Sequence, residues 1–447
     1  MARRRTREGR KLGEIPDTLQ SEHGRERMIH EADAVVIGAG AFGCSTALHL
    51  SKLGLGRVAL VDRFEPASQT SPRAAGLFKS LQKTQLLSHL AQLSMQKVVG
   101  FEAEMGVAVP FVRSGSLTIA ETPGLAEVLR EKAAHARQWG VELEMIDSKE
   151  ARDRMPLMEA LDAEAVCHTF EDVYIEEPSS LLRVYIEAGE RMGMVTVPNA
   201  PVTGIRTRDG AVEVVITDEG EISTPIVVDA AGAWARVVAR SGGAELPLVP
   251  IRHQLLITDP IEGAEPAHPI LRFVDSAVYV RTARAGLMLG GFEPDPLIVD
   301  PRDGGPNFSV EDVPLDSAPL DAMASAVEEK IPDLRSPSVA ELRGGLFTMT
   351  PDGGFLAGPV PSVDGLWTLT GCNGSGFSFS PVLGQLLAEW VIEGEPSVDL
   401  SEFRPGRFSQ RSPGEEELRD AGVRQYETSP SEEELRDAGV HQYTHYY

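Results

Sequence analysis

The sequence predicts an α/β fold in which a Rossmann-like dinucleotide-binding domain is interleaved with an α+β domain built on an antiparallel sheet. Three observations support this prediction: a glycine-rich turn between a strand and a helix near residue 40, β-rich segments between about residues 248 and 290, and a second glycine-rich turn before a helix near residue 375. At 447 residues the chain exceeds the usual size of one compact core, so we expect two domains.

The first glycine-rich turn joins a strand to a helix in an expected βαβ unit over residues 34–61. Gly38 permits a tight reversal, Gly40 lets backbone amides approach a pyrophosphate, and Gly43 lets the helix pack closely on the strand. Asp62 follows the second strand, roughly 20 residues after the last glycine, where an acidic residue accepts hydrogen bonds from a ribose. The unit therefore predicts a dinucleotide site, and it fits NAD and FAD equally well.

Charge and hydropathy exclude several classes of partner. The chain has 42 Lys and Arg against 67 Asp and Glu, and its net charge of −25 repels nucleic acids and anionic membrane surfaces. No apolar run approaches the roughly 20 residues that span a bilayer, and no apolar segment follows the N-terminal arginines, so we expect a cytoplasmic protein with no membrane partner. Three scattered cysteines predict neither disulfides nor a metal site, and each is expected to be a small buried hydrophobe.

The expected domains are discontinuous along the chain. Residues 81–156 read as mostly helical and form a separate layer, whereas the β-rich segments after residue 248 predict a second, antiparallel sheet. A buried strand near residue 228 returns the chain to the first domain. The expected segments are a disordered N-terminal extension (residues 1–30), the nucleotide-binding domain (31–85, 157–245 and 343–395), the substrate domain (86–156 and 246–342) and an acidic C-terminal tail (396–447).

The C-terminal tail contains a near-duplication. Residues 415–426 read EEELRDAGVRQY, and residues 432–443 read EEELRDAGVHQY. Because there are only two copies, we interpret the duplication as a feature of the tail and not as a solenoid.

The second glycine-rich turn, at residues 371–377, lies between an expected strand at 366–370 and a helix expected at about 381–392. Ser380 can cap that helix, and Pro381 suits its first turn. Glycines before a helix N-terminus place backbone amides and a positive dipole where negative charge develops on a reduced flavin. An ordinary strand-to-helix loop is the alternative. The turn favours FAD over NAD, because FAD lies extended across its domain and needs contacts from distant segments.

Six segments in this order resemble the D-amino-acid oxidase and sarcosine oxidase superfamily of flavoenzymes, and the resemblance covers nearly all of residues 33–395. The segments are residues 35–43, 71–77, 227–234, 286–290, 350–352 and 370–377. The resemblance implies an FAD-binding domain of the glutathione-reductase type split by a substrate domain. It also implies oxidation of the C–N bond of an amine or amino acid by hydride transfer to flavin, chemistry that belongs to the cofactor.

The resemblance and the glycine turns together give the expected FAD site. Residues 71–77 would run beside the pyrophosphate and the isoalloxazine, Val202 would lie near the adenine, and Ala231 and Gly232 would lie along the cofactor. The expected FAD-binding residues are Gly38, Gly40, Ala41, Phe42, Gly43, Asp62, Arg63, Ser71, Arg73, Ala74, Ala75, Gly76, Leu77, Val202, Ala231, Gly232, Trp234, Gly371, Asn373, Gly374, Ser375, Gly376 and Phe377.

Within the superfamily, residues 250–254, 278–281 and 290–293 look most like the dimethylglycine and sarcosine dehydrogenase branch. His253 and Tyr279 match positions that face the flavin there. A histidine suits this place because the amine must lose a proton before it releases hydride, and the ordinary pKa of histidine is near working pH. Arg281 is a candidate to bind a substrate carboxylate. For all three residues a structural role is the open alternative.

Four departures from the superfamily limit what carries over. Arg73 and Gly345 stand where relatives bond flavin covalently through histidine or cysteine, so we expect non-covalent FAD. Met288 replaces an oxygen-activating lysine, which leaves oxygen and another electron acceptor both open. Phe347 replaces the arginine with which glycine oxidases bind carboxylate, and Arg343 is the nearest alternative. We find no counterpart of the folate-binding domain of the longer dehydrogenases and expect no transfer to folate.

We therefore expect an FAD-dependent oxidoreductase that converts a secondary or tertiary amine, or an N-substituted amino acid, to an imine that hydrolyses. Its expected partners are the small-molecule amine and oxygen or another electron acceptor. Two alternatives stay open: a flavin-dependent oxidoreductase of 2-hydroxy acids, and a catalytically silent FAD-binding subunit of a hetero-oligomer. Substrate identity and oligomeric state are open as well.

Overall fold

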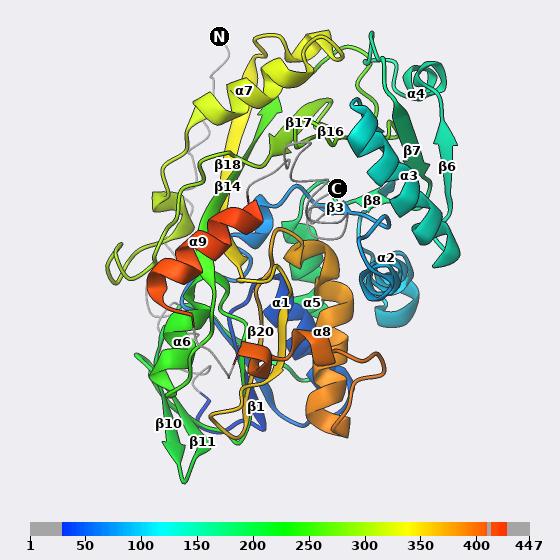
Figure 1. Cartoon of the computed structure of the whole chain (residues 1–447). Helices are drawn as coiled ribbons and strands as arrows, with labels where there is room; N and C mark the ends of the chain where they lie inside the picture. Colours follow the sequence, from blue (N-terminus) through cyan, green and yellow to red (C-terminus); the bar gives the residue numbers. More distant parts are fainter. Residues whose placement is uncertain (1–28, 409–412, 427–447) are drawn as a thin grey trace, which may run out of the picture.

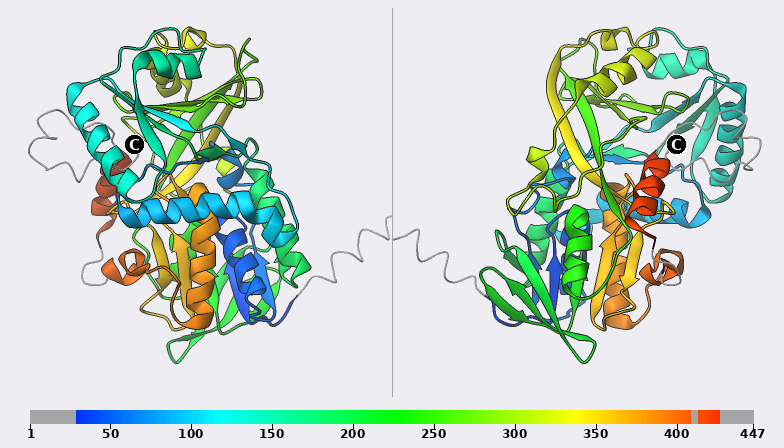
Figure 2. Two further views of the ribbon diagram at one scale, coloured as in Figure 1. Left: turned by 90° about the vertical axis from the view of Figure 1, so that its right-hand side faces the viewer. Right: turned by 60° about the vertical axis from the view of Figure 1, so that its left-hand side comes forward.

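The protein is built on two large sheets, one in each of two parts that lie end to end (Figures 1 and 2). The computed structural model describes residues 29–408 and 413–426. Residues 1–28, nearly all of the extension expected to be disordered (residues 1–30), lie outside the described residues. The second tail repeat lies outside them as well. The first part carries the nucleotide-binding signals, and the second carries the antiparallel strands, so the predicted α/β fold is confirmed.

The first sheet has six strands in the order β19-β20-β13-β1-β2-β9, and all neighbours except β19 and β20 are parallel. Val36 lies in register beside Val228 and Leu60. Every residue of β1 and β2 is buried, as expected for parallel strands covered on both faces. The strands are β1 (Ala34–Ile37), β2 (Val58–Val61), β9 (Val195–Val197), β13 (Val227–Asp229), β19 (Leu356–Pro359) and β20 (Leu366–Thr370).

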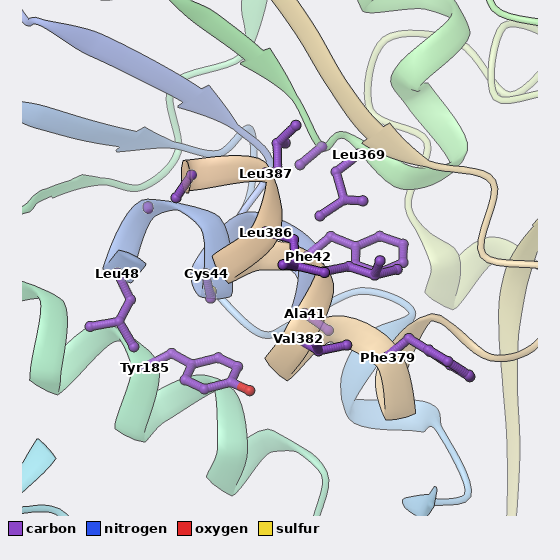
Figure 3. Close-up of a cluster of buried hydrophobic side chains, with 14 of the residues drawn as sticks. Ala41, Phe42, Cys44, Leu48, Tyr185, Leu369, Phe379, Val382, Leu386 and Leu387 are labelled. Carbon is purple, nitrogen blue, oxygen red and sulfur yellow. The ribbon is translucent and has the colours of Figure 1, made fainter. Parts of the chain in front are cut away.

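Helices α1, α5 and α8 pack together on one face of this sheet (Figure 1), and α2 lies across α8 (Figure 2). Their contact is an apolar cluster in which Phe42 and Leu48 of α1 meet Val382 and Leu386 of α8, with Tyr185 of α5 beside them (Figure 3). The opposite face is covered by a three-stranded antiparallel sheet and α6. These elements are α1 (Ala41–Lys52), α2 (Gln85–Met105), α5 (Ser179–Arg191), α6 (Ala235–Ser241), α8 (Gly376–Glu393), β10 (Val202–Arg208), β11 (Ala211–Thr217) and β12 (Gly220–Ser223).

The second sheet has eight strands in the order β18-β14-β17-β16-β15-β5-β7-β6, and only β5 and β15 are parallel neighbours. Helices α4 and α7 border one apolar cluster of this sheet, and α3 borders another (Figure 1). These elements are β5 (Ser116–Ala120), β6 (Leu143–Ile146), β7 (Ala165–Thr169), β14 (Val249–Thr258), β15 (Ile270–Phe273), β16 (Val278–Ala283), β17 (Gly286–Gly291), β18 (Val339–Met349), α3 (Pro123–Gln138), α4 (Ser148–Arg154) and α7 (Ser317–Val327).

The interpretation of residues 81–156 as mostly helical is wrong in part, because β5 and β6 come from this segment. The residues of β5, Ser-Leu-Thr-Ile-Ala, alternate polar and apolar over most of the strand, which is a strand signal, although all five are buried. β7, which lies in the segment 157–245, pairs with β5 and β6 in the second sheet. The topology therefore places β7 in the eight-stranded sheet and not in the six-stranded sheet.

Short elements complete the described chain. Beyond residue 394, Leu400 and Phe403 are buried in the core around α8, so the start of the tail packs as part of the first domain. Among the described residues, no helix combines the length and the apolar character needed to cross a membrane. The short elements are β3 (Leu77–Phe78), β4 (Val112–Arg113), β8 (Val173–Tyr174), η2 (Ser71–Arg73), η3 (Gly232–Trp234), η4 (Val310–Asp312), η5 (Pro332–Leu334), η6 (Ser401–Phe403), η7 (Pro405–Phe408) and α9 (Glu415–Tyr426).

The start of α8 differs from the prediction. The helix begins at Gly376, five residues before Pro381, and Ser380 is buried inside it instead of capping it. A proline inside a helix removes the hydrogen bond to the carbonyl four residues earlier, which here is that of Phe377. The Ser380 hydroxyl donates to the same carbonyl at 2.9 Å. The missing bond is thereby replaced, and the helix N-terminus reaches the glycine turn.

Because α1 and α8 cross closely, replacing a glycine by alanine should change stability in opposite directions at Gly384 of α8 and at Gly100 of α2. A Cβ added at Gly384 would lie 2.3 Å from Ser45 Oγ and 2.8 Å from the Ser45 carbonyl carbon, whereas one at Gly100 of α2 has nothing within 4 Å. We expect Gly384→Ala to lower the free energy of unfolding by about 1–3 kcal/mol. Gly100→Ala should raise it by roughly 0.5–1 kcal/mol. Urea unfolding of both variants checks this, and equal effects would contradict the close crossing.

Candidate active site

The first glycine turn takes the conformation that its sequence predicts. Gly38 has φ of 104°, and a Cβ there would lie 2.5 Å from the carbonyl oxygen of Ala230. A Cβ at Gly43 would lie 1.8 Å from the Gly38 carbonyl oxygen. Only glycine fits these two positions, and α1 can therefore begin directly after β1.

Asp62 holds this turn from the end of β2. Its Oδ2 accepts a hydrogen bond from the Ala39 amide at 2.6 Å, and its Oδ1 accepts one from the Phe64 amide at 2.7 Å. Burial raises the pKa of Asp62 to about 6, although both amides oppose the shift. The carboxylate therefore fixes the geometry of the loop, and its contact with a ribose stays a prediction.

Residues 71–77 lie beside the turn. Ser71 Oγ accepts a hydrogen bond from the Ala41 amide, the first of α1, at 3.0 Å. Arg73 donates to the carbonyls of Ser68 and Gln69 and pairs with Glu311 at 3.1 Å. The segment is therefore fixed against the N-terminus of α1.

The second glycine turn leads into α8. Asn373 was expected to contact the cofactor, but its side chain holds the turn instead. Its Oδ1 accepts from the Thr350 amide at 2.9 Å, and its Nδ2 donates to the Gly371 carbonyl at 2.7 Å. Cys372, expected to be buried, is half-buried and lines the cavity described next.

Both turns open into one cavity between the two sheets. Many of the expected FAD-binding residues line this cavity, and so do the catalytic candidates His253 and Tyr279. Other lining residues were not predicted from the sequence. The predicted lining residues are Gly40, Ala41, Phe42, Ser71, Arg73, Ala74, Ala75, Gly76, Leu77, Gly232, His253, Tyr279, Gly374, Ser375, Gly376 and Phe377. Predicted residues outside the lining are Gly38, Gly43, Asp62, Arg63, Val202, Ala231, Trp234, Arg281, Gly371 and Asn373.

Part of the second group lies together beyond Asp62. The Arg63 guanidinium stands over the rings of Phe64 and Trp234, at 5.1 and 5.4 Å from their centres. Val202 and Ala231 pack against the same apolar cluster behind the sheet. Contacts of these residues with the adenine end of the cofactor stay a prediction.

His253 and Tyr279 meet in the cavity although β17 separates their strands. His253 Nε2 and the Tyr279 hydroxyl are 3.2 Å apart. They meet over Gly290 of β17, where a Cβ would lie 2.3 Å from the Tyr279 oxygen. The His253 ring stacks on Phe347, with ring centres 4.3 Å apart.

Burial sets the protonation of this pair. Desolvation lowers the pKa of His253 to about 3 and raises the pKa of Tyr279, so both side chains are neutral near neutral pH. The argument that histidine suits this place because its ordinary pKa is near working pH is therefore wrong here. A neutral imidazole and a phenol can instead hold a neutral amine by hydrogen bonds.

Arg281 does not face the cavity, which argues against its expected contact with a substrate carboxylate. It is fully buried, and its Nε donates to the Ala75 carbonyl at 3.0 Å. Its Nη1 pairs with Glu176 at 2.9 Å, and its guanidinium lies 4.5 Å from the centre of the Tyr174 ring. Arg281 thus joins the substrate sheet to residues 71–77. Arg343, the other candidate, pairs with Glu341 outside the cavity.

Two cations that sequence reasoning missed line the cavity instead. Arg272 of β15 is buried directly across from Tyr279 in the sheet, and Lys79 follows β3. Desolvation, together with the positive charges of Lys132 and Arg272, lowers the pKa of Lys79 well below its ordinary value. Arg272 could have been noticed, because it is a charged residue inside the otherwise apolar strand 270–273. Lys79 lies just past the segment 71–77 and had no such signal.

The cavity fits the pyrophosphate and the flavin ring of FAD. Neither α1 nor α8 has an acidic residue in its first turn. The N-cap of α1 is Gly40, and the side chain of Ser375, the N-cap of α8, makes no capping hydrogen bond. The positive ends of both helix dipoles therefore face the cavity, where an anionic group is stabilised. α1 with Ser71 would hold the pyrophosphate, and α8 would face the flavin ring.

Comparisons with known proteins agree with this geometry. A family model described as FAD dependent oxidoreductase matches residues 33–390. The chain is 30% identical over 386 residues to mitochondrial sarcosine dehydrogenase of Mus musculus, covering 84% of this chain and 41% of that protein. It is also 30% identical over 379 residues to 4-methylaminobutanoate oxidase (formaldehyde-forming) of Paenarthrobacter nicotinovorans, covering 84% and 45%. The crystal structure of L-proline dehydrogenase from P. horikoshii has a TM-score of 0.77 at 21% identity, covering 86% of this chain and 99% of that one.

The fold and the two helix N-termini define a dinucleotide-binding protein of the flavoprotein class. The matching model covers most of the chain, and the chain belongs to the family of FAD-dependent oxidoreductases, whose cofactor is FAD. It spans less than half of the length of the two relatives by sequence.

The neutral state of His253 makes stability depend on pH. Its pKa is about 3 in the folded protein against 6.5 in an unfolded chain, so between these values only the unfolded state binds the proton. The free energy of unfolding therefore falls as the pH drops below 6.5. From pH 6.5 to about 5, we expect the wild type to lose up to about 1.4 kcal/mol per pH unit more than His253→Gln.

Urea unfolding at several pH values checks this expectation. His135→Gln is the matched control, because His135 is exposed on α3, and it should keep the wild-type dependence. Parallel curves for His253→Gln and the wild type would mean that His253 is protonated in the folded state.

Proposed function

We propose that the protein oxidises the C–N bond of an N-substituted amino acid, a secondary or tertiary amine that carries a carboxylate, to an imine that hydrolyses in water. The observation that carries the proposal is the single cavity in which the N-termini of α1 and α8, the neutral pair His253 and Tyr279, and the cations Lys79 and Arg272 meet. FAD, when bound, supplies the acceptor for the hydride. The relatives named for sarcosine and 4-methylaminobutanoate suggest an N-methyl group as the substituent.

The protonation state of the cavity supports an amine substrate. The carbon attached to the nitrogen releases hydride only when the nitrogen lone pair is free to form the C=N bond, so the amine must be neutral. Desolvation and the nearby Arg272 guanidinium both disfavour an ammonium ion. His253 and Tyr279 can exchange hydrogen bonds with a neutral amine, and they thereby orient its C–H bond toward the flavin.

The carboxylate end of the substrate follows from the same cations. Arg272 presents a planar guanidinium that matches a carboxylate. Lys79 lines the same cavity, and a carboxylate bound beside it would favour its charged form, which burial disfavours. A carboxylate would in turn offset the positive charge of the guanidinium. We therefore assign recognition of the carboxylate to Arg272 and Lys79, in place of Arg281.

The surroundings of Arg73 and Gly345 support a non-covalent cofactor. Arg73 is held by Ser68, Gln69 and Glu311, and Gly345 has no side chain that could bond to flavin. We expect acid precipitation of the purified protein to leave all flavin in the supernatant, as absorbance near the flavin maximum measures. A yellow pellet would contradict this assignment.

The substrate class can be tested by anaerobic reduction of the bound flavin, followed in a stopped-flow spectrometer. We expect N-methyl amino acids to bleach the flavin and their methyl esters to bind more weakly. Arg272→Met should raise the dissociation constant for the acid by roughly 10- to 100-fold and leave that for the ester nearly unchanged, because it removes a charge-assisted hydrogen bond. Arg113→Met is the matched control on the exposed strand β4.

Two outcomes would favour the alternatives. Bleaching by 2-hydroxy acids but not by amines would identify a hydroxy-acid oxidoreductase. Stoichiometric FAD that no compound in the panel reduces would identify a catalytically silent flavin-binding subunit.

A further inference from the structure

Helix α9, the first of the two tail repeats, docks on the strands that carry the cavity wall. It lies along β14 and β18 (Figure 1). Leu418 is only 2% exposed and packs in a cluster with Val249 and Ile251 of β14 and Met349 of β18. We call the surface formed by these three residues the tail groove.

The contact face of α9 has a defined pattern. Leu418, Ala421 and Gly422 are buried, and their spacing of three and four residues places them on one side of the helix. A Cβ at Gly422 would lie 3.4 Å from Val249 Cβ and 3.5 Å from Ile251 Cδ1. The helix backbone therefore lies directly against β14, and a large residue at position 422 would separate them.

The N-terminal end of α9 is held by charge. Glu415 pairs with Arg236 at 2.9 Å, with Arg240 at 3.3 Å and with Arg302 at 3.7 Å. A carboxylate at the start of a helix is also favoured by the helix dipole. The tail groove and these three arginines together recognise an acidic residue, a leucine and a pair of small residues in a fixed order.

The second repeat keeps every one of these determinants. Of its twelve residues only one differs, His441 in place of Arg424, and Arg424 is exposed. The substitution therefore falls on the side of the helix that faces away from the groove. The counterparts of the contact residues Glu415, Leu418, Ala421 and Gly422 are Glu432, Leu435, Ala438 and Gly439.

We propose that the tail groove is a recognition site for this twelve-residue motif, and that residues 432–443 of the same chain bind it as an alternative to residues 415–426. When the second repeat is bound, 23 residues instead of 6 separate Phe408 from the bound repeat. Loop-closure entropy then lowers the binding constant of the second repeat by less than about tenfold. A tethered segment reaches an effective concentration near the millimolar range, which favours the same chain over a second copy.

The tail groove lies behind one wall of the cavity. Phe292 and Phe347 pack against the cluster that holds Leu418, and both line the cavity beside His253. The second repeat has the same residues at the contact positions, so its binding would keep this wall supported when the first repeat is released.

Disulfide trapping in the full chain tests the proposal. The 3.4 Å separation of the Cβ positions at 249 and 422 is close to the distance of roughly 3.5–4.5 Å that a disulfide requires. V249C/G422C should therefore link rapidly under mild oxidation. V249C/G439C should form the corresponding intramolecular bond, within about tenfold of that rate once Leu418→Asp has weakened the first repeat. V249C/H441C, whose second cysteine faces away from the groove, is the matched control.

The products are identified by peptide mass mapping without reduction. A V249C/G439C bond that forms no faster than the control would overturn the proposal. A bond that joins two chains would overturn it as well, because the occupant would then be a second copy.

A binding measurement covers the case in which V249C does not fold. Full-length Leu418→Asp/Leu435→Asp leaves the groove without a competent repeat. Labelled peptides of residues 412–426 and 429–443 should bind it with dissociation constants within about threefold of each other, and the second peptide with Leu435→Asp should bind at least tenfold more weakly. Binding of the first peptide alone would overturn the proposal.

Discussion

The position of the cavity depends on close contacts that only glycines permit at the two glycine turns. Gly38 lies against the carbonyl of Ala230, and Gly43 lies against that of Gly38, at distances that leave no room for side chains. At the second turn, a Cβ on Gly376 would lie 3.2 Å from the Phe42 ring of α1. Both helices therefore begin at the cavity, and their positive ends converge there.

Features with local signals could be predicted from the sequence. The first turn needs glycines at fixed spacing, and β20 is an apolar run bounded by glycines, so both appear where the sequence indicates. The start of α8 could not be predicted in this way. Pro381 normally marks a helix boundary, and the hydroxyl that replaces its missing hydrogen bond belongs to a residue that would equally serve as a cap.

The place of Arg272 beside Tyr279 could not be predicted, because it depends on strand register. Tyr279 and Arg281 are two residues apart and share one face of β16, which made Arg281 a natural candidate. A residue two positions along a strand is nearly 7 Å away, whereas a cross-strand neighbour is about 5 Å away. Arg272 is that cross-strand neighbour of Tyr279. Nor does residue type alone give the protonation of His253, because desolvation in the assembled cavity decides it.

The buried position of Arg281 bears on how substrate and product travel. Its guanidinium belongs to the substrate sheet, yet it bonds Ala75 and Glu176 of the neighbouring part of the chain. Hinge-like separation of the two parts would leave that guanidinium without its partners, and an unpaired buried charge is unfavourable. Substrate and product would therefore enter and leave more easily by movement of side chains and loops at the cavity mouth. These small movements, and not opening of the whole molecule, would then limit the turnover rate.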